Sequence, residues 1–394
     1  MRRVALVTYH CPPVLNAESI LVWKTLRRLS SQHAVTVFTS PIGRGGIDSA
    51  MAIPENVRVV REPDVQFSSR FLDRASNKAI GMLVDEKFPW SQLAELRVAH
   101  DEFDVIYSRS QPGASHILAL RLKRLLNVPW VAQLSDPWAS NPYHSSHTKF
   151  RSRVDAHYEA RVVTECDRLI FPTVEIERLY ERQYPSIDIR AKSVVLPHHT
   201  STDLYTLQSA PISYSPNKLN LAYFGDFYGS RSPEPLIRAV NEICDKRPEV
   251  ADKLLIHFVG NVESKFQPLV DSCRVPIRRG KVGYVESLNA MTNADILLLI
   301  DAPNPSGETP FFPSKLIDYL GARRPILGIT ELSGTAPNIL RSYGYPVIRP
   351  EDVDGIREQL EAWMESPPTT SAKPIDDFLT DVVVDGLSDI LEQA

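Results

Sequence analysis

The chain has 394 residues, of which 43% are hydrophobic and 23% charged, a composition typical of soluble globular proteins and not of disordered ones. This length exceeds what a single hydrophobic core usually holds, so we expect two domains. The formal net charge of −4 leaves no basic excess to neutralise a nucleic-acid backbone, which excludes that class of partner.

The cysteines at positions 11, 166, 244 and 273 stand far apart and form no C-x-x-C pair. This spacing suggests neither a zinc site nor a disulfide framework, and reduced thiols in the cytoplasm fit it best. The apolar run at residues 4–7 is too short for a signal peptide, so we interpret it as part of a first strand. No apolar run reaches the ~20 residues of a spanning helix, so we expect any membrane contact to be peripheral, at the inner membrane face.

Short apolar runs alternate with amphipathic segments through the first half of the chain, which predicts a doubly wound α/β domain with a parallel sheet. The predicted strands cover residues 4–9, 33–40, 57–61, 104–110, 130–135, 168–172 and 193–197. The predicted helices cover residues 17–29, 113–126, 150–165 and 174–184. Parallel strands end at one edge of their sheet, so we expect the polar groups at these ends to bind a ligand.

The aromatic and basic residues of segment 64–100 allow two interpretations. The segment interleaves aromatic with basic side chains: Phe67, Phe71, Phe88 and Trp90 with Arg70, Arg74, Lys78 and Lys87. It is either a helical excursion whose aromatic side chains face the core, or a surface that rests on an anionic membrane to reach a lipid-linked acceptor. We favour the core interpretation, because aromatic spacing alone does not prove an interfacial face.

Two polar motifs follow strands of the first domain. Asp136 and Trp138 stand in an Asp-Pro-Trp sequence, which indicates either a binding loop or a turn with a packed tryptophan. His198 and His199 follow the last strand, but no third ligand stands at a useful spacing, so we expect no metal there.

The alternation starts afresh at residue 219 and predicts a second parallel α/β domain. Its predicted strands cover residues 219–224, 253–259, 277–282, 294–300, 325–330 and 345–348. After the first of these strands, Gly225 and Gly229 permit a tight loop, and Arg231 stands beside a helix start near Ser232. A charge-assisted bond from Arg231 to a diphosphate would contribute about 1.5–3 kcal/mol.

The helix between the fourth and fifth of these strands is a predicted anion site. It starts near Pro313 and Ser314, whose hydroxyl can cap the free backbone N–H groups. The N–H groups and the helix dipole favour a phosphate at this start, and Lys315 adds a full charge. One turn deeper, Asp318 can accept hydrogen bonds from ribose hydroxyls. The alternative is a surface ion pair of Lys315 and Asp318, worth about 0.3 kcal/mol.

The segments PSKLIDYLGARRPILGI (313–329) and GDFYGSRSPEPLIRA (225–239) resemble the donor-binding segments of retaining GT-B glycosyltransferases, in particular glycosyltransferase family 4. The resemblance implies a diphosphate site made by Gly229, Arg231, Ser314 and Lys315. It implies that Asp318 binds the ribose and that Val282 and Tyr284 bind the base. Pro310 stands where the family has the first of two glutamates, and Glu308 is its substitute. The residues assigned to the donor sugar are Glu308, Thr309, Pro310, Phe311 and Phe312.

The first domain is similar to the same family at its Pro12-Pro13 turn and at the pair SQP (110–112) and LSDPW (134–138). The similarity implies that the acceptor is bound by Asn16, Glu18, Ser19 and Trp138. Asp136 would position the acceptor hydroxyl or accept its proton. Asn16 is equally typical of a helix cap, and both interpretations stay open.

We therefore expect two doubly wound, Rossmann-like parallel-sheet domains facing a cleft. Residues 1–205 would bind the acceptor and residues 206–374 the nucleotide sugar, with residues 375–394 packed back on the first domain. The resemblance implies a glycosyltransferase of polysaccharide biosynthesis that retains the anomeric configuration. Arg231 and Lys315 would stabilise the leaving diphosphate, so the enzyme would need no metal and no cofactor besides its donor substrate.

The sequence leaves several alternatives open for the acceptor and for the reaction class. The acceptor would be a glycan, a lipid-linked molecule or a small molecule. One alternative is a nucleotide-sugar 2-epimerase of the same fold, and another is a non-catalytic subunit that binds a nucleotide sugar or a glycan. The sequence indicates no oligomeric state.

Overall fold

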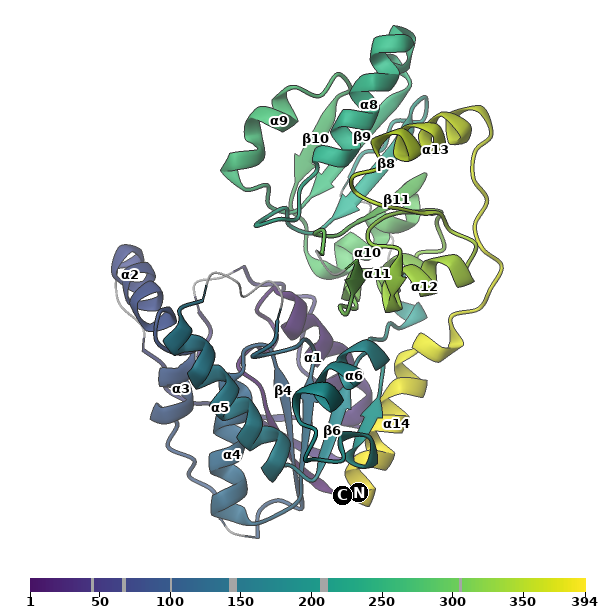
Figure 1. Cartoon of the computed structure of the whole chain (residues 1–394). Coiled ribbons are helices and arrows are strands. Elements are labelled where there is room, and N and C mark those ends of the chain that lie inside the picture. The colour runs from purple at the N-terminus through teal and green to yellow at the C-terminus, as the bar shows by residue number, and fades with distance from the viewer. Residues whose placement is uncertain (44–45, 66–68, 100, 142–146, 206–211, 305–306) are drawn as a thin grey trace. The chain divides into compact units, whose positions relative to one another are not determined.

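The computed structural model describes residues 1–43, 46–65, 69–99, 101–141, 147–205, 212–304 and 307–394 (Figure 1). The chain divides into two compact units. Unit 1 contains Met1–His199 and Thr380–Ala394, and unit 2 contains Thr200–Leu379. Each unit is built on its own parallel sheet, whose central strands are buried.

The described residues of unit 1 contain a seven-stranded sheet in the order β3-β2-β1-β4-β5-β6-β7. Its strands are β1 (Arg3–Val7), β2 (Ala34–Thr39), β3 (Arg58–Arg61), β4 (Val105–Ser110), β5 (Trp130–Leu134), β6 (Arg168–Phe171) and β7 (Ser193–Val195). Its helices are α1 (Ala17–Leu29), α2 (Arg70–Gly81), α3 (Phe88–Leu93), α4 (Ala114–Leu126), α5 (Lys149–Glu165), α6 (Val174–Gln183), α7 (Ile189–Lys192) and α14 (Thr380–Gln393). β1 pairs with both β2 and β4, so the strand order reverses beside β1. Open parallel sheets bind ligands outside the carboxyl ends of strands at such a reversal.

The described part of unit 2 repeats this plan with six parallel strands in the order β10-β9-β8-β11-β13-β15. These strands are β8 (Leu219–Phe224), β9 (Leu254–Val259), β10 (Ile277–Gly280), β11 (Ile296–Ile300), β13 (Ile326–Ile329) and β15 (Val347–Ile348). A separate two-stranded sheet joins β12 (Glu308–Thr309) to β14 (Ser333–Gly334). The helices are α8 (Glu234–Lys246), α9 (Gln267–Asp271), α10 (Tyr284–Asn293), α11 (Ser314–Gly321), α12 (Thr335–Ser342) and α13 (Val353–Glu365). Here the strand order reverses beside β8, which pairs with β9 and β11.

The helices α1 and α11 begin at the carboxyl edges of the two sheets, and they are capped differently. Asn16 caps α1, because its side-chain oxygen accepts a hydrogen bond of 2.9 Å from the backbone N–H of Ser19. This confirms the capping interpretation of Asn16. α11 begins at Ser314 as predicted, but its cap residue is Pro313, which has no side-chain oxygen, and the start carries no side-chain cap. The expectation that the Ser314 hydroxyl caps this helix is therefore wrong.

The C-terminal helix α14 belongs to the core of unit 1. Its apolar side chains Val384, Leu387 and Leu391 are buried in one cluster with side chains of β1, α1 and β2. Polar contacts fix the same helix against α1, including two bonds of 2.9 Å from the Arg28 guanidinium to Asp385. Packing of α14 thus completes one face of the unit 1 sheet (Figure 1).

Segment 64–100 forms the helices α2 and α3, and the two differ in burial. Trp90 of α3 is fully buried, and the half-buried Phe88 packs against the core, which confirms the core interpretation for these two residues. Phe71 of α2 is 78% exposed, so the same interpretation is wrong for Phe71. Phe67 lies outside the described residues.

We expect the substitution Leu391→Ala to lower the unfolding free energy of unit 1 by about 2–5 kcal/mol, because it removes a fully buried side chain from the core. Val382→Ala on the same helix is the matched control, since Val382 is 54% exposed and its truncation should change stability by about 0.5 kcal/mol or less. Urea unfolding followed by tryptophan fluorescence measures this, because Trp23, Trp90, Trp130 and Trp138 of unit 1 are four of the five tryptophans. Equal stability of the two variants would contradict the placement of α14 in the core.

Candidate functional site

The charged groups of unit 2 gather where β8 and β11 end. Arg231 lies in the loop after β8, and the buried Asp301 follows β11 directly. The Arg231 guanidinium donates to Asp301 Oδ1 at 3.4 Å and lies 5.4 Å from the ring centroid of Tyr228. Asp301 therefore holds Arg231 at the ligand-binding edge of the sheet.

Lys315 reaches the same place from the first turn of α11. Its Nζ donates to the Tyr223 hydroxyl at 2.9 Å and lies 4.3 Å from the centroid of the Tyr223 ring. Gly225 makes room for it, because a β-carbon at that position would lie 2.7 Å from Lys315 Nζ. Burial, together with the nearby charge of Arg231, lowers the pKa of Lys315 to about 7. The structure thus brings two cationic side chains together near the carboxylates of Asp301 and Asp226.

Asp318 and Lys315 lie on the same helix but have different hydrogen-bond partners. Its carboxylate is buried, and Oδ1 accepts a hydrogen bond of 2.9 Å from the Tyr284 hydroxyl, while its backbone oxygen accepts one of 3.0 Å from the Tyr205 hydroxyl. Lys315 instead bonds to Tyr223. The alternative of a surface ion pair between Lys315 and Asp318 is wrong, because Asp318 is buried and the two side chains have separate hydrogen-bond partners.

The remaining residues predicted for the donor lie in unit 2, in the loop after β8, in the segment before α10 and in the segment that leads into α11. Ser314 is half-buried at the first position of the helix, Gly229 is exposed in the β8–α8 loop, and Val282 is half-buried before α10. In the segment that precedes α11, Glu308 is exposed, Thr309 is buried, and Pro310 and Phe311 are half-buried. The pairing of β12 with β14 holds this segment in place. The two strands approach so closely that a β-carbon on Gly334 would lie 2.1 Å from the carbonyl oxygen of Thr309. Phe312 is buried, and its ring lies 6.2 Å from that of Phe378.

In unit 1 the corresponding edge is occupied by a buried ion pair. Arg109 at the end of β4 donates from Nε to Glu18 Oε1 at 2.8 Å, and Ser135 Oγ donates to Glu18 Oε2 at 2.9 Å. Arg109 also donates to the hydroxyl of Thr25 at 3.2 Å. Burial raises the pKa of Glu18 even though Arg109 stabilises the carboxylate. Glu18 and Ser19, both predicted to contact an acceptor, are buried, so that expectation is wrong for them.

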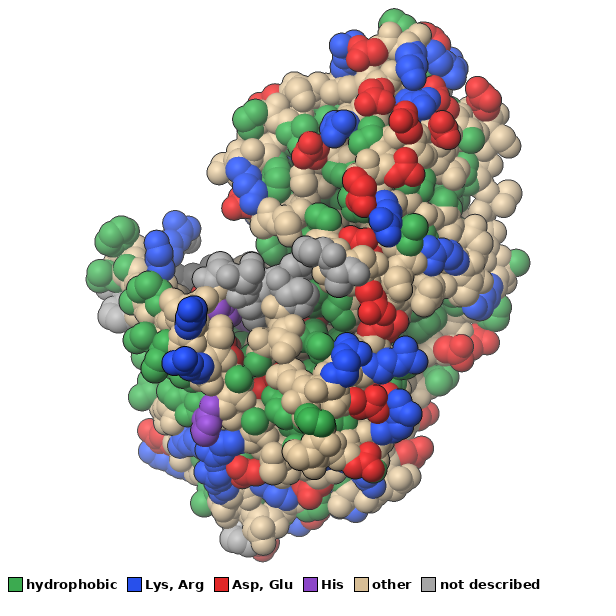
Figure 2. Space-filling view, viewed as in Figure 1, with side chains coloured by type: hydrophobic (Ala, Val, Ile, Leu, Met, Phe, Trp, Pro, Cys, Tyr) green, Lys and Arg blue, Asp and Glu red, His purple; other side chains and the backbone are tan. Residues whose placement is uncertain are grey.

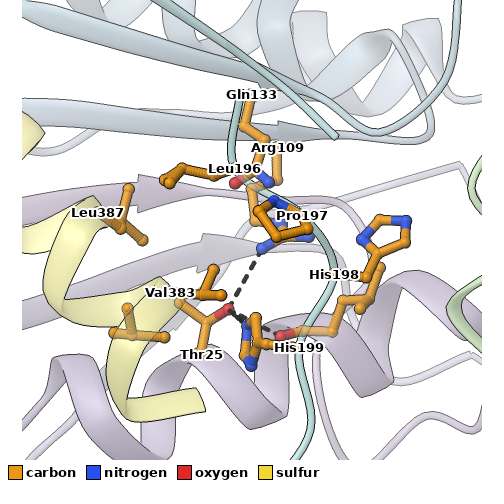
Figure 3. A pocket seen from close by; sticks show the side chains of 11 residues that line it. Thr25, Arg109, Gln133, Leu196, Pro197, His198, His199, Val383 and Leu387 are labelled. Carbon is orange, nitrogen blue, oxygen red and sulfur yellow. Dashed lines mark hydrogen bonds between the residues drawn. The ribbon is translucent and has the colours of Figure 1, made fainter. Parts of the chain in front are cut away.

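A small cavity lies beside this ion pair, with Thr25, Arg109, His198 and His199 in its lining (Figure 3). His199 lies 3.2 Å from the Thr25 hydroxyl through Nε2 and 3.0 Å from the Thr380 hydroxyl through Nδ1. The cavity measures about 10 Å³, which is room for about one water molecule. This space is too small for a sugar. Among the described residues, no group of three or more His, Cys, Asp or Glu side chains could hold a metal ion.

The Asp-Pro-Trp turn follows β5 as a packed turn. Trp138 is only 2% exposed, and a β-carbon on Gly113 would lie 2.2 Å from its ring. Its backbone N–H donates to the Tyr180 hydroxyl at 3.4 Å. The expectation that Trp138 stacks on a sugar is therefore wrong, because the ring is enclosed by the start of α4. Asp136, two residues earlier, is only partly buried at the carboxyl end of β5.

Sequence reasoning missed the partners that hold the predicted charges in place. Asp301 and Tyr223 of unit 2 were not singled out, and Arg109 of unit 1 was included only among the polar residues at the end of its predicted strand, without its partner Glu18. Asp301 and Arg109 both stand at the end of predicted strands, where parallel sheets bind ligands, so their position was a usable signal. Tyr223 lies inside a strand among apolar residues and gave no signal of its own.

Comparison with known proteins assigns the fold. Residues 21–197 match the family model described as "Glycosyl transferase 4-like domain". No match was found among curated proteins. Sucrose-phosphate synthase from Thermosynechococcus elongatus superposes with a TM-score of 0.72 at 14% identity, covering 100% of this chain and 99% of that one.

Two further solved structures extend the comparison. HepE of Anabaena in complex with UDP-glucose gives a TM-score of 0.66 at 12% identity, with 100% of both chains covered. WaaG, a glycosyltransferase involved in lipopolysaccharide biosynthesis, gives 0.62 at 16% identity, with 99% of this chain and 100% of that chain covered. The chain therefore has the GT-B fold, which confirms the predicted fold class and the resemblance to GT-B glycosyltransferases.

We expect Glu18→Leu to destabilise unit 1 by about 3–5 kcal/mol, because it leaves the Arg109 guanidinium buried without its partner. The double variant Glu18→Leu/Arg109→Met should lose much less than the two single variants together, since it removes both charges. Urea unfolding of the three variants and of the control Glu55→Leu, at an exposed position, measures the coupling. Additive losses would show that the two side chains do not act as a pair.

Proposed function

We propose that this chain is a glycosyltransferase that moves a sugar from a nucleotide-diphosphate donor to an acceptor hydroxyl. The observation that carries this function is the meeting of Arg231 and Lys315 at the strand reversal of unit 2, beside the start of α11. Two cations and the N–H groups of a helix start are groups that bind phosphate oxygens. The GT-B fold and the matching family model support the same class of reaction.

The donor is assigned to unit 2 in three parts. Gly229, Arg231, Ser314 and Lys315 bind the diphosphate. Asp318 accepts a ribose hydroxyl in place of the Tyr284 hydroxyl that it holds in this structure, and Val282 and Tyr284 bind the base. Residues 308–312 contact the sugar. UDP-glucose is the first donor to test, because the HepE and trehalose-6-phosphate structures are described with UDP-glucose and UDP-2-fluoro glucose.

In the transfer, the bond between the anomeric carbon and the diphosphate oxygen breaks, and the acceptor oxygen bonds to the anomeric carbon. Negative charge grows on the departing diphosphate, and Arg231 and Lys315 stabilise it there. The acceptor proton passes to a donor phosphate oxygen, with Asp136 positioning the acceptor hydroxyl. This route retains the anomeric configuration and uses side-chain charge where other enzymes use a metal ion. The acceptor is a glycan, a lipid-linked molecule or a small molecule.

The experiment that tests this function measures nucleoside diphosphate released from UDP-, GDP-, TDP- and ADP-glucose, with and without added acceptors. A thermal-shift screen against the four free diphosphates selects the base first. We expect one base to bind and its sugar donor to release diphosphate when an acceptor is present. A 2-epimerase would instead alter the sugar of the donor, and a binding subunit would bind the donor without releasing diphosphate from it under any condition.

We expect Arg231→Ala and Lys315→Ala each to weaken binding of the nucleoside diphosphate by roughly tenfold or more, because each removes a charged hydrogen-bond donor. Lys246→Ala is the control, since Lys246 is an exposed cation at the end of α8 in the same unit. Titration calorimetry measures the affinities. Unchanged affinity in the two site variants would refute the diphosphate assignment.

Binding of the diphosphate should also weaken as the pH rises above 7. Lys315 has a pKa of about 7 without ligand, so it becomes neutral above that pH, and the bound phosphate favours its charged form. Binding then requires uptake of a proton, and affinity should fall by up to about tenfold per pH unit until the pKa of the bound form is reached. Calorimetry in two buffers of different ionisation enthalpy measures the uptake. The Lys315→Ala variant should show none, and an equal uptake in that variant would place the titrating group elsewhere.

A further inference from the structure

Helix α2 turns its apolar face outward. At the helical repeat, Phe71, Leu72, Ala75 and Ala79 fall on one face, which Met82 and Leu83 extend past the last turn. All six are exposed. Asp73, Asn77 and the apolar Ile80, on the opposite face, are only half-exposed. A surface helix usually buries its apolar stripe, so α2 is unusual in exposing most of its apolar side chains.

Hydrogen bonds from α5 hold the end of α2 and fix this orientation. The Thr148 hydroxyl donates to the backbone oxygen of Met82 at 2.5 Å, and Arg151 donates to the backbone oxygen of Gly81 at 3.0 Å and to that of Val84. Arg151 is itself buried and paired with Asp155 at 2.6 Å. The first turn of α5, which carries the exposed Phe150, therefore lies at the C-terminal end of α2, next to Met82.

We call this surface the α2 patch. It consists of five large apolar side chains with exposed fractions between 48% and 78%, which are Phe71 78%, Leu72 48%, Met82 50%, Leu83 55% and Phe150 57%. Single exposed apolar side chains are ordinary, but a contiguous group of this kind marks an interaction surface. Figure 2 shows hydrophobic and basic side chains gathered over α2.

The border of the α2 patch is mainly basic, although the exposed carboxylate of Glu86 lies close to Gly81 at the end of α2. Arg74 and Lys78 lie on α2 beside the apolar face, Lys149 and Arg153 lie on α5 around Phe150, and all four side chains are exposed. The chain as a whole carries a net charge of −4, so this cluster of cations opposes the overall charge. Long basic side chains can keep their charged ends in the headgroup layer while their stems cover apolar surface.

We propose that the α2 patch docks on the surface of an anionic lipid bilayer. A bilayer supplies both an apolar layer for Phe71 and its neighbours and a sheet of negative charge for the four cations. A second copy of the chain would place the same cations against each other, which disfavours a symmetric interface between copies. Among the described residues, no helix is long and apolar enough to cross a bilayer.

The test is flotation of the full chain with vesicles of phosphatidylcholine alone and of phosphatidylcholine mixed equally with phosphatidylglycerol. We expect binding to the mixed vesicles at low salt, little binding to phosphatidylcholine, and release as salt rises. Phe71→Ser/Met82→Ser should lower binding to the mixed vesicles by about tenfold or more, and Arg74→Ala/Lys78→Ala should lower it by about tenfold. Vesicle binding is measured without substrate, so its outcome is separate from that of the transfer reaction.

Leu125→Ser is the matched control, because Leu125 is 48% exposed on α4 and lies outside the patch. It should bind vesicles as the unmodified chain does. Circular dichroism checks that all variants are folded, which their exposed positions favour. Failure of the unmodified chain to bind the mixed vesicles, or equal binding by Phe71→Ser/Met82→Ser, would overturn the proposal. A dimer that this same variant dissociates would assign the patch to a second copy and overturn it too.

Discussion

In both sheets the strand order reverses beside one strand, and this reversal decides where each unit places its buried charges. In unit 1, Arg109 and Glu18 form a buried ion pair there, with a bond of 2.8 Å. In unit 2, the cationic side chains of Arg231 and Lys315 lie near the carboxylates of Asp301 and Asp226. The same topology thus places a buried ion pair at one edge and two cationic side chains beside a helix start at the other.

Desolvation decides how strongly that second edge attracts an anion. An ammonium group loses its hydration when it is buried, and the Tyr223 ring and hydroxyl replace only part of what water supplied. The pKa of Lys315 therefore falls to about 7, near neutral pH, instead of staying at its ordinary value. A phosphate bound beside Lys315 would favour the charged form of its side chain and so raise its pKa again. Lys315 would then become fully charged only when the ligand binds, at a position where the protein has already fixed the hydrogen-bond donors.

The sequence was sufficient to predict the helices and strands, but not to predict which distant side chains contact each other. Alternating apolar runs gave the parallel sheets, and local signals gave β8 and α11 with the bounds that the structure has. The pairs Arg231–Asp301 and Arg109–Glu18 join residues 70 and 91 positions apart, and no local pattern specifies such contacts. Burial of Trp138 likewise depends on Gly113, which leaves the space for its ring. The interleaved aromatic and basic residues of segment 64–100 likewise left open which side chains face the core, because the direction of α2 depends on bonds from α5.

The outward orientation of the apolar face of α2 is relevant to the class of acceptor. An outward apolar face keeps hydrocarbon in contact with water at an energetic cost, which the hydrogen bonds of Thr148 and Arg151 to the end of α2 help to offset. A chain that docks through this face holds unit 1 at the bilayer surface. Unit 1 also carries Asp136, the residue proposed to position the acceptor hydroxyl. Of the three proposed acceptor classes, a lipid-linked molecule is the one that would be concentrated at that surface.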